Sequence, residues 1–173
     1  MDVQIIDLNI PKNINKQIST LLANHHWYKG YDLELNENSR YNDLKQGIRR
    51  GFSVETFNGA NPINLNTSLN LFANLVYETT LEKLQISGEI FRFYWNLCLP
   101  GDIFDLHTDV DKINHYSIIY NLQTTDGGTI IDGHKYQDKE SQVKLFQSNI
   151  LHKGVSPTNS QFRMNLNIVF KKY

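Results

Sequence analysis

Residues 99–109 have the sequence Leu-Pro-Gly-Asp-Ile-Phe-Asp-Leu-His-Thr-Asp, past the middle of a chain of 173 residues. The segment Leu99-Pro100-Gly101-Asp102 predicts a turn, because proline and glycine favour turn conformations. His107 and Asp109 are two residues apart, so in an extended segment both side chains point to the same side. They can therefore reach one metal ion without a contorted backbone.

A third metal ligand is expected from a later strand. His152 follows Asp109 by 43 residues, beyond several strand-like segments, as a barrel or folded sheet requires. Two imidazoles and one carboxylate on one face of a metal leave positions open for an oxidisable cosubstrate and dioxygen. An isolated His-x-Asp is common by chance. The glycine-rich turn at 126–129 and the apolar segment at 143–146, which leads into His152, favour a non-haem Fe(II) site.

Two segments on either side of this region have the alternation of half-buried strands. In residues 91–98 and 162–170, large apolar side chains alternate with polar ones. Asn96 lies on the polar face of the first segment, and Arg163, Asn165 and Asn167 on that of the second. A buried carboxylate must be paired, and the planar guanidinium of Arg163 suits that role. The alternative is a solvated strand face, which we favour for Asn167 and leave open for Asn165.

From about Glu89 to Phe170 these features resemble the double-stranded β-helix of the Fe(II)/2-oxoglutarate dioxygenases. The shared order is a turn, His-x-Asp, Gly-Gly, a distal histidine and an arginine eleven residues later. Residues 120–128 and 145–163 are most similar to the prolyl hydroxylase branch, including its small phage and bacterial members. The resemblance implies a mainly β fold with a jelly-roll, cupin-like core, buttressed by N-terminal helices.

The resemblance also implies site residues. His107, Asp109 and His152 would bind Fe(II), and Arg163 would pair with the C5 carboxylate of 2-oxoglutarate. Asn96 and Asn165 recur in motifs similar to those of AlkB-like nucleic-acid demethylases, where Asn-x-Tyr and Arg-x-Asn contact the oxoacid. Tyr120 is a further candidate, although strand alternation would reverse its face.

Two departures from the demethylase pattern make that branch the less favoured one. Cys98 stands where the demethylases have tyrosine, and Val169 stands where the repair enzymes have a second arginine. A net charge of -1 also provides no broad basic surface for nucleic acid.

The implied activity is hydroxylation of a C–H bond with O2, coupled to oxidative decarboxylation of 2-oxoglutarate to succinate and CO2. Peptidyl, specifically prolyl, hydroxylation is the first expectation, with a peptide or protein as the substrate partner. One alternative is the same chemistry on a nucleic-acid base or a small molecule. The other is a non-catalytic β-helix module that only binds a ligand.

Length and composition favour one domain over residues 1–173, with 40% hydrophobic residues for a sizeable core. A single cysteine excludes an internal disulfide framework. No apolar run has transmembrane length, and the N-terminus lacks a signal-peptide pattern. We therefore expect a soluble cytoplasmic protein that does not bind membranes.

Residues 1–88 are expected to provide helical support and substrate loops, and residues 89–173 the catalytic core. Helical spacing predicts a helix from Pro11 to His25, with Ile14, Ile18, Leu21 and Leu22 as its apolar residues. A second helix is expected from an N-cap at Thr67 to about Gln85, with an apolar stripe of Leu71, Phe72, Leu75, Val76 and Leu84. Between them, the polar segment 28–66 is a candidate for substrate loops or a lid.

The remaining histidines and the cysteine are not expected to bind metal or react. His25 and His26 end a helix, His134 lies in a turn between strands, and His115 lacks paired spacing. Cys98 has no identifiable base beside it, so we expect a buried or barrel-lining thiol.

Overall fold

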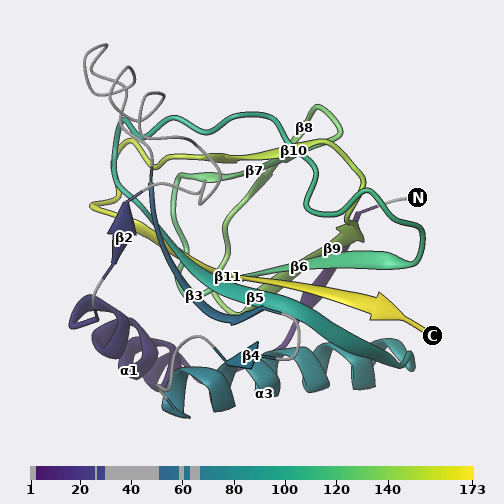
Figure 1. The fold of residues 1–173 in the computed structure, drawn as a ribbon. Helices are drawn as coiled ribbons and strands as arrows, with labels where there is room; N and C mark the ends of the chain where they lie inside the picture. The colour runs from purple at the N-terminus through teal and green to yellow at the C-terminus, as the bar shows by residue number, and fades with distance from the viewer. Residues whose placement is uncertain (1–2, 26, 30–50, 59–60, 63–66) are drawn as a thin grey trace.

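A computed structural model of the chain describes residues 3–25, 27–29, 51–58, 61–62 and 67–173. Most of the polar segment 28–66, including much of the expected loop region, lies outside these residues. Within them, strands form two sheets, and helices cover the outer side of the larger one (Figure 1).

The larger sheet is antiparallel and contains eight strands among the described residues, in the order β1-β9-β6-β11-β5-β3-β2, with β4 paired to β3. The strands are β1 Gln4–Asp7, β2 Tyr28–Lys29, β3 Phe52–Asn58, β4 Asn61–Pro62, β5 Gly88–Cys98, β6 His115–Asn121, β9 Gln142–Gln147 and β11 Arg163–Lys172. The last strand, β11, pairs with both β5 and β6 near the centre of the sheet. Strands distant in sequence are thereby neighbours, as the double-stranded β-helix requires.

The smaller sheet contains three strands among the described residues, in the order β10-β7-β8. Its strands are β7 Gly128–Ile131, β8 His134–Gln137 and β10 His152–Val155. A two-residue turn joins β7 to β8, and Asp132 and Gly133 there both have positive φ, as hairpin turns of this kind demand. Figure 1 shows this sheet on the side of the larger sheet that the helices leave free.

Two helices, α1 (Lys12–Ala23) and α3 (Thr67–Leu84), lie against the larger sheet (Figure 1). In α1 the residues that pack inward are Asn15, Ile18 and Leu22, at helical spacing. In α3 they are Leu69, Phe72, Ala73, Val76, Tyr77, Thr80 and Leu81. The predicted helices and their packing on the outside of the sheet are confirmed.

The apolar stripe expected on the second helix was partly wrong. Leu71 and Leu75 are 66% and 51% exposed, while Leu69 and Ala73 are buried. The hydrophobic spacing in this helix fits two overlapping faces, and only contact with the sheet selects one of them. Thr67 is the first helical residue and not the residue before it.

The main hydrophobic core lies between the helices and one face of the larger sheet. Trp95, Leu166 and Tyr120 lie on three adjacent strands and pack there with Phe72 of α3. Because side chains alternate along a strand, the opposite face of the same strands holds the polar residues. That polar face is turned toward the smaller sheet and forms the interior of the barrel.

In the described part of the chain, no helix is long and apolar enough to cross a membrane.

Candidate metal centre and acid-binding site

The three expected metal ligands lie together. His107 and His152 form an isolated antiparallel bridge, in which each backbone N–H donates to the other's carbonyl at 3.0 and 2.8 Å. The potential ligand atoms of His107, Asp109 and His152 all lie within 4.8 Å of one another. The Asp109 carboxylate is 3.5 Å from His152 Nε2. The fold thus brings Asp109 and His152 together although they are 43 residues apart in the sequence.

Both histidines are held with the same ring nitrogen free. Nδ1 of His107 lies 3.0 Å from the carbonyl of Asp105, and Nδ1 of His152 lies 2.9 Å from the carbonyl of Ile150. A carbonyl only accepts, so Nδ1 carries a proton, and in the neutral imidazole Nε2 then has the lone pair that a metal needs. Nε2 of His152 is buried without a hydrogen-bond partner. An orphaned buried nitrogen beside a carboxylate fits a metal ligand.

Asp109 is fixed by donors from three strands. Its Oδ1 accepts from Nη2 of Arg92 at 2.9 Å and from the Tyr94 hydroxyl at 3.4 Å. Its Oδ2 accepts from the Ser117 hydroxyl at 2.6 Å and from Nδ2 of Asn167 at 3.4 Å. Such partners orient a metal-binding carboxylate before the ion arrives.

The electrostatic surroundings favour the forms that bind metal. Burial raises the pKa of Asp109, but His152, Arg92 and the bond from Ser117 outweigh burial and hold that pKa below its usual range. Burial lowers the pKa of His152, with partial opposition from Asp109. The site therefore presents one carboxylate and neutral imidazole, a donor set that suits non-haem iron.

Arg163 lies in the same interior and is 3% exposed. Its Nε donates to Oδ2 of Asp138, and its Nη2 donates to Oδ1 of Asp138 at 3.3 Å and to the Thr129 hydroxyl at 3.1 Å. Its Nη1 contacts the sulfur of Cys98 at 3.6 Å. Cys98 is a buried, barrel-lining thiol, as predicted.

The expected asparagines share the interior face with Arg163. Nδ2 of Asn96 donates to Oδ1 of Asn165 at 3.0 Å across the β5–β11 pair. Turning the Asn165 amide over replaces that bond and places its oxygen 2.8 Å from Nη1 of Arg163. Asn165 and Asn167 are both buried, so the solvated strand face favoured for Asn167 was wrong. The smaller sheet covers this face, which the alternation of β11 alone does not reveal.

Tyr120 lies on the opposite face of β6, which corrects its assignment to the cosubstrate. Its ring packs against Phe72 in the core, and its hydroxyl donates to Oδ1 of Asn15 in α1 at 2.6 Å. Burial raises the pKa of Tyr120 to about 12. Strand alternation places its neighbour Asn121, and not Tyr120, on the interior face.

The sequence did not single out Asp138 and Lys144. Both are buried, and Nζ of Lys144 lies 2.8 Å from Oδ1 of Asp138. A signal was present for Lys144, which is the one charged residue in the otherwise apolar segment Val143-Lys144-Leu145-Phe146. Asp138 follows β8 in a polar segment and has no local pattern that marks it as buried.

Gly154 packs closely against the ring of Phe104, with Arg163 on the same side. Gly154 lies two residues after His152 on β10, so both face the interior. A Cβ on Gly154 would lie 3.3 Å from the Phe104 ring and 3.6 Å from Nη1 of Arg163. A side chain at Gly154 would therefore press on the Phe104 ring and approach the guanidinium of Arg163.

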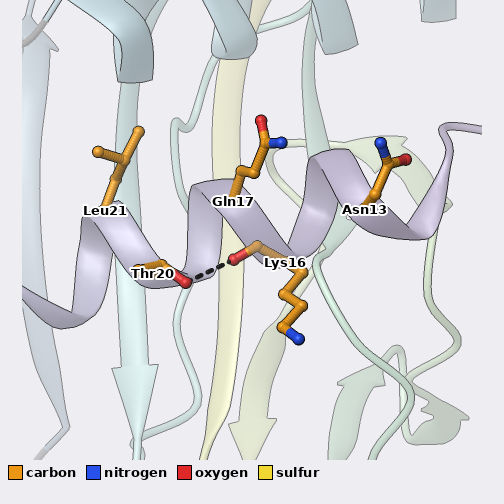
Figure 2. A pocket seen from close by; sticks show the side chains of 5 residues that line it. All are labelled: Asn13, Lys16, Gln17, Thr20 and Leu21. Carbon is orange, nitrogen blue, oxygen red and sulfur yellow. Dashed lines mark hydrogen bonds between the residues drawn. The ribbon is translucent and has the colours of Figure 1, made fainter.

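One hollow in the described structure lies away from these residues. It has a volume of about 520 Å³ and is lined by Asn13, Lys16, Gln17, Thr20 and Leu21 of α1 (Figure 2). All five side chains are exposed. They supply neither a metal-ligand cluster nor a buried charge, and we assign no site there.

Comparison with known proteins is informative only at the level of structure. No family model matches the sequence, and no curated protein matches it. A Pseudomonas putida prolyl-4-hydroxylase is 16% identical, with a TM-score of 0.64 over 99% of this chain and 92% of its own. The non-heme alpha-ketoglutarate-dependent epimerase SnoN of nogalamycin biosynthesis is 9% identical, with a TM-score of 0.69 over 97% of this chain and 76% of its own.

This is the fold of the 2-oxoglutarate-dependent Fe(II) oxygenases. HygX from Streptomyces hygroscopicus, solved with nickel and 2-oxoglutarate, is also similar. It is 9% identical, with a TM-score of 0.67 over 98% of this chain and 82% of its own. The predicted double-stranded β-helix with flanking helices is confirmed.

Proposed function

We propose that this chain is an Fe(II)- and 2-oxoglutarate-dependent oxygenase. The observation that supports this most is the orphaned, buried Nε2 of His152, 3.5 Å from the Asp109 carboxylate and close to His107. When bound, the metal and 2-oxoglutarate would supply the oxidising chemistry, in which one atom of O2 ends in the succinate formed with CO2 from 2-oxoglutarate and the other ends in the hydroxylated substrate. The chain supplies position, charge and exclusion of water.

His107, Asp109 and His152 hold the metal, and the remaining positions on it are left for exchangeable ligands. His152 is buried, whereas His107 is exposed. Behind His152, the ring of Phe146 lies 4.8 Å from the imidazole and packs with Ile119 and Ile131. These apolar side chains therefore exclude water from the His152 side of the metal site. The substrate approaches from the exposed side, where His107 lies.

Arg163 binds the distal carboxylate of 2-oxoglutarate. It is buried in the barrel interior, and its Nη1 lies on the side of Gly154, which shares a face of β10 with His152. A guanidinium pairs with a carboxylate through parallel N–H bonds, which fixes orientation as well as charge. Asn165 supports that end, because with its amide turned over its oxygen accepts from Nη1 and Nη2 of Arg163 at 2.8 and 3.2 Å.

The proposed substrate is a prolyl residue of a peptide or protein. The order of motifs between residues 120 and 163 is most similar to the prolyl hydroxylase branch. In addition, this chain covers 92% of the Pseudomonas prolyl-4-hydroxylase but only 76% and 82% of SnoN and HygX. The chain thus accounts for a larger share of the prolyl hydroxylase than of SnoN or HygX.

A small molecule is the second candidate substrate. SnoN and HygX superpose with TM-scores of 0.69 and 0.67, above the 0.64 of the prolyl-4-hydroxylase. A nucleic-acid substrate is less favoured than either, because a net charge of -1 provides little attraction for phosphates.

Succinate formation tests both the proposed oxygenase activity and the proposed peptide substrate. Purified protein is supplied with Fe(II), 2-oxoglutarate and O2, together with proline-containing peptides or with a small-molecule collection. We expect succinate in proportion to a product 16 Da heavier, and only with the peptides. Succinate coupled to a small molecule would overturn the peptide assignment. If no substrate gives succinate and the protein does not bind 2-oxoglutarate, the oxygenase proposal is overturned.

A further inference from the structure

Three charged side chains form a buried cluster in the barrel interior. Asp138, Lys144 and Arg163 are 2%, 0% and 3% exposed, and the two cations both bond to the one carboxylate. Burial of an ion is costly unless a partner neutralises it. With both cations charged, the cluster has one positive charge in excess, which is suited to one incoming carboxylate.

Asp138 occupies one particular edge of Arg163. It accepts from Nε and Nη2, whereas the contacts of Nη1 within the described residues are with neutral groups, the sulfur of Cys98 and the amide of Asn165. Nη1 is also the guanidinium atom that lies 3.6 Å from a Cβ built on Gly154, on the face of β10 that carries His152. The guanidinium is therefore turned with its uncompensated end toward the side of β10 that carries His152, where the oxoacid is proposed to bind.

Asp138 is itself held from both its backbone and its side chain. Its carbonyl accepts from the N–H of Thr125 at 3.4 Å, and its Oδ2 accepts from the Thr125 hydroxyl at 3.1 Å. Its backbone N–H lies 3.5 Å from the carbonyl of Gly127. A carboxylate fixed in this way can fix the arginine that binds it.

We propose that Asp138 is a positioning residue that orients Arg163 for the distal carboxylate of the oxoacid. Lys144 offsets the charge of Asp138, so that Arg163 keeps its attraction for that carboxylate. This inference rests on the proposed function. It assigns to Asp138 and Lys144 a role in selecting oxoacids with a second carboxylate over those without one.

Calorimetry on the full chain loaded with redox-inert Mn(II) tests this role. The titrants are 2-oxoglutarate and 2-oxobutyrate, which has no distal carboxylate. In Asp138→Asn, the Kd for 2-oxoglutarate is expected to rise about tenfold, because a charge-assisted bond that orients Arg163 is lost. The Kd for 2-oxobutyrate and for Mn(II) should be unchanged. In Lys144→Met, the Kd for 2-oxoglutarate alone should rise several-fold.

The double variant Asp138→Asn/Lys144→Met separates orientation from charge. It retains the single excess positive charge but not the carboxylate that holds Arg163, so we expect it to remain about tenfold weaker for 2-oxoglutarate. It also leaves no unpaired lysine, so it serves when Asp138→Asn does not fold. Wild-type affinity in the double variant would overturn the positioning role, and wild-type affinity in Lys144→Met would overturn the charge role.

Surface substitutions provide matched controls. Asp7→Asn and Lys139→Met change an exposed pair 4.0 Å apart and should leave every affinity unchanged. If wild-type protein binds Mn(II) but not 2-oxoglutarate, the proposed function fails. If wild type binds 2-oxoglutarate and all the variants bind it equally well, only the present inference fails.

Discussion

At the scale of single residues, the proposed chemistry depends on which atoms each side chain leaves free. His107 and His152 each use Nδ1 on a carbonyl two residues earlier, which leaves Nε2 for a metal. The sequence predicted these two and Asp109 because few residue types ligate metals. It did not predict Ser117 or Arg92, because serine and arginine in strands have no pattern that marks them as partners of a carboxylate.

Ser117→Ala is expected to weaken metal binding. The Ser117 hydroxyl donates to Oδ2 of Asp109 at 2.6 Å, and partners of this kind typically contribute about 10- to 100-fold to metal affinity. Titration of the apoprotein with Mn(II) measures the effect. Ser141→Ala is the control, since Ser141 is buried against α1 and bonds to the carbonyl of Ile10. Equal metal affinity in wild type and Ser117→Ala would contradict the proposed orienting role.

At the scale of elements, alternation along β5 and β11 separates the core from the barrel interior. This period of two was visible in the sequence, and the structure confirms the two faces. The burial of the polar face was not predictable from the same pattern. It depends on the smaller sheet, whose strands β7, β8 and β10 are separated in sequence from β5.

Leu166→Ala should destabilise the sheet at its centre. Leu166 is fully buried and lies opposite Trp95 on β5 and Tyr120 on β6. Truncation leaves a cavity and is expected to lower the free energy of unfolding by about 3 kcal/mol, as measured by urea denaturation. Leu71→Ala, on the exposed face of α3, should change it by less than about 0.5 kcal/mol. Comparable losses in the two variants would contradict the packing of α3 described above.

The turn before β11 should be sensitive to acid. Asp126 accepts from the backbone N–H groups of Thr158, Asn159 and Ser160 at 2.8 to 2.9 Å. These bonds, and those from the Thr158 and Ser160 hydroxyls, hold the pKa of Asp126 far below its ordinary value of 3.8. Because the pKa is depressed in the folded state, the stabilisation is complete above about pH 4 and is lost as the pH falls further.

Thermal unfolding of Asp126→Asn tests that dependence. The variant should have a lower Tm than wild type at pH 7, and the difference should shrink as the pH falls below about 4. A Tm difference that stays constant from pH 7 to pH 3 would show that the charge of Asp126 does not stabilise the turn.

At the scale of the whole molecule, the helices attach to the outside of the barrel through apolar packing and through polar contacts of Asn15 in α1. The Tyr120 hydroxyl bonds to Asn15 of α1, which also donates to Ser141. The sequence predicted two helices against the sheet from their spacing. Strand alternation already argued against an interior position for Tyr120, and the register of β6 with β11 and β9 places it on the helix side.

Tyr120→Phe is expected to lower the free energy of unfolding by about 1 to 2 kcal/mol, because Oδ1 of Asn15 loses a buried donor. Affinity for 2-oxoglutarate should be unchanged, since Tyr120 faces away from the barrel interior. A double-mutant cycle with Asn15→Ala should return a coupling energy of at least about 0.5 kcal/mol. Weaker cosubstrate binding with unchanged stability would restore Tyr120 to the site.

The central claim is that His107, Asp109 and His152 form a metal site that accepts 2-oxoglutarate. An anaerobic titration of the protein with Fe(II) and then 2-oxoglutarate tests it directly, by visible absorption. We predict a weak metal-to-ligand charge-transfer band in wild type, because the oxoacid chelates the iron, and its loss in Asp109→Ala. Folded, iron-loaded wild type without the band, or Asp109→Ala with a band of equal intensity, would contradict the account.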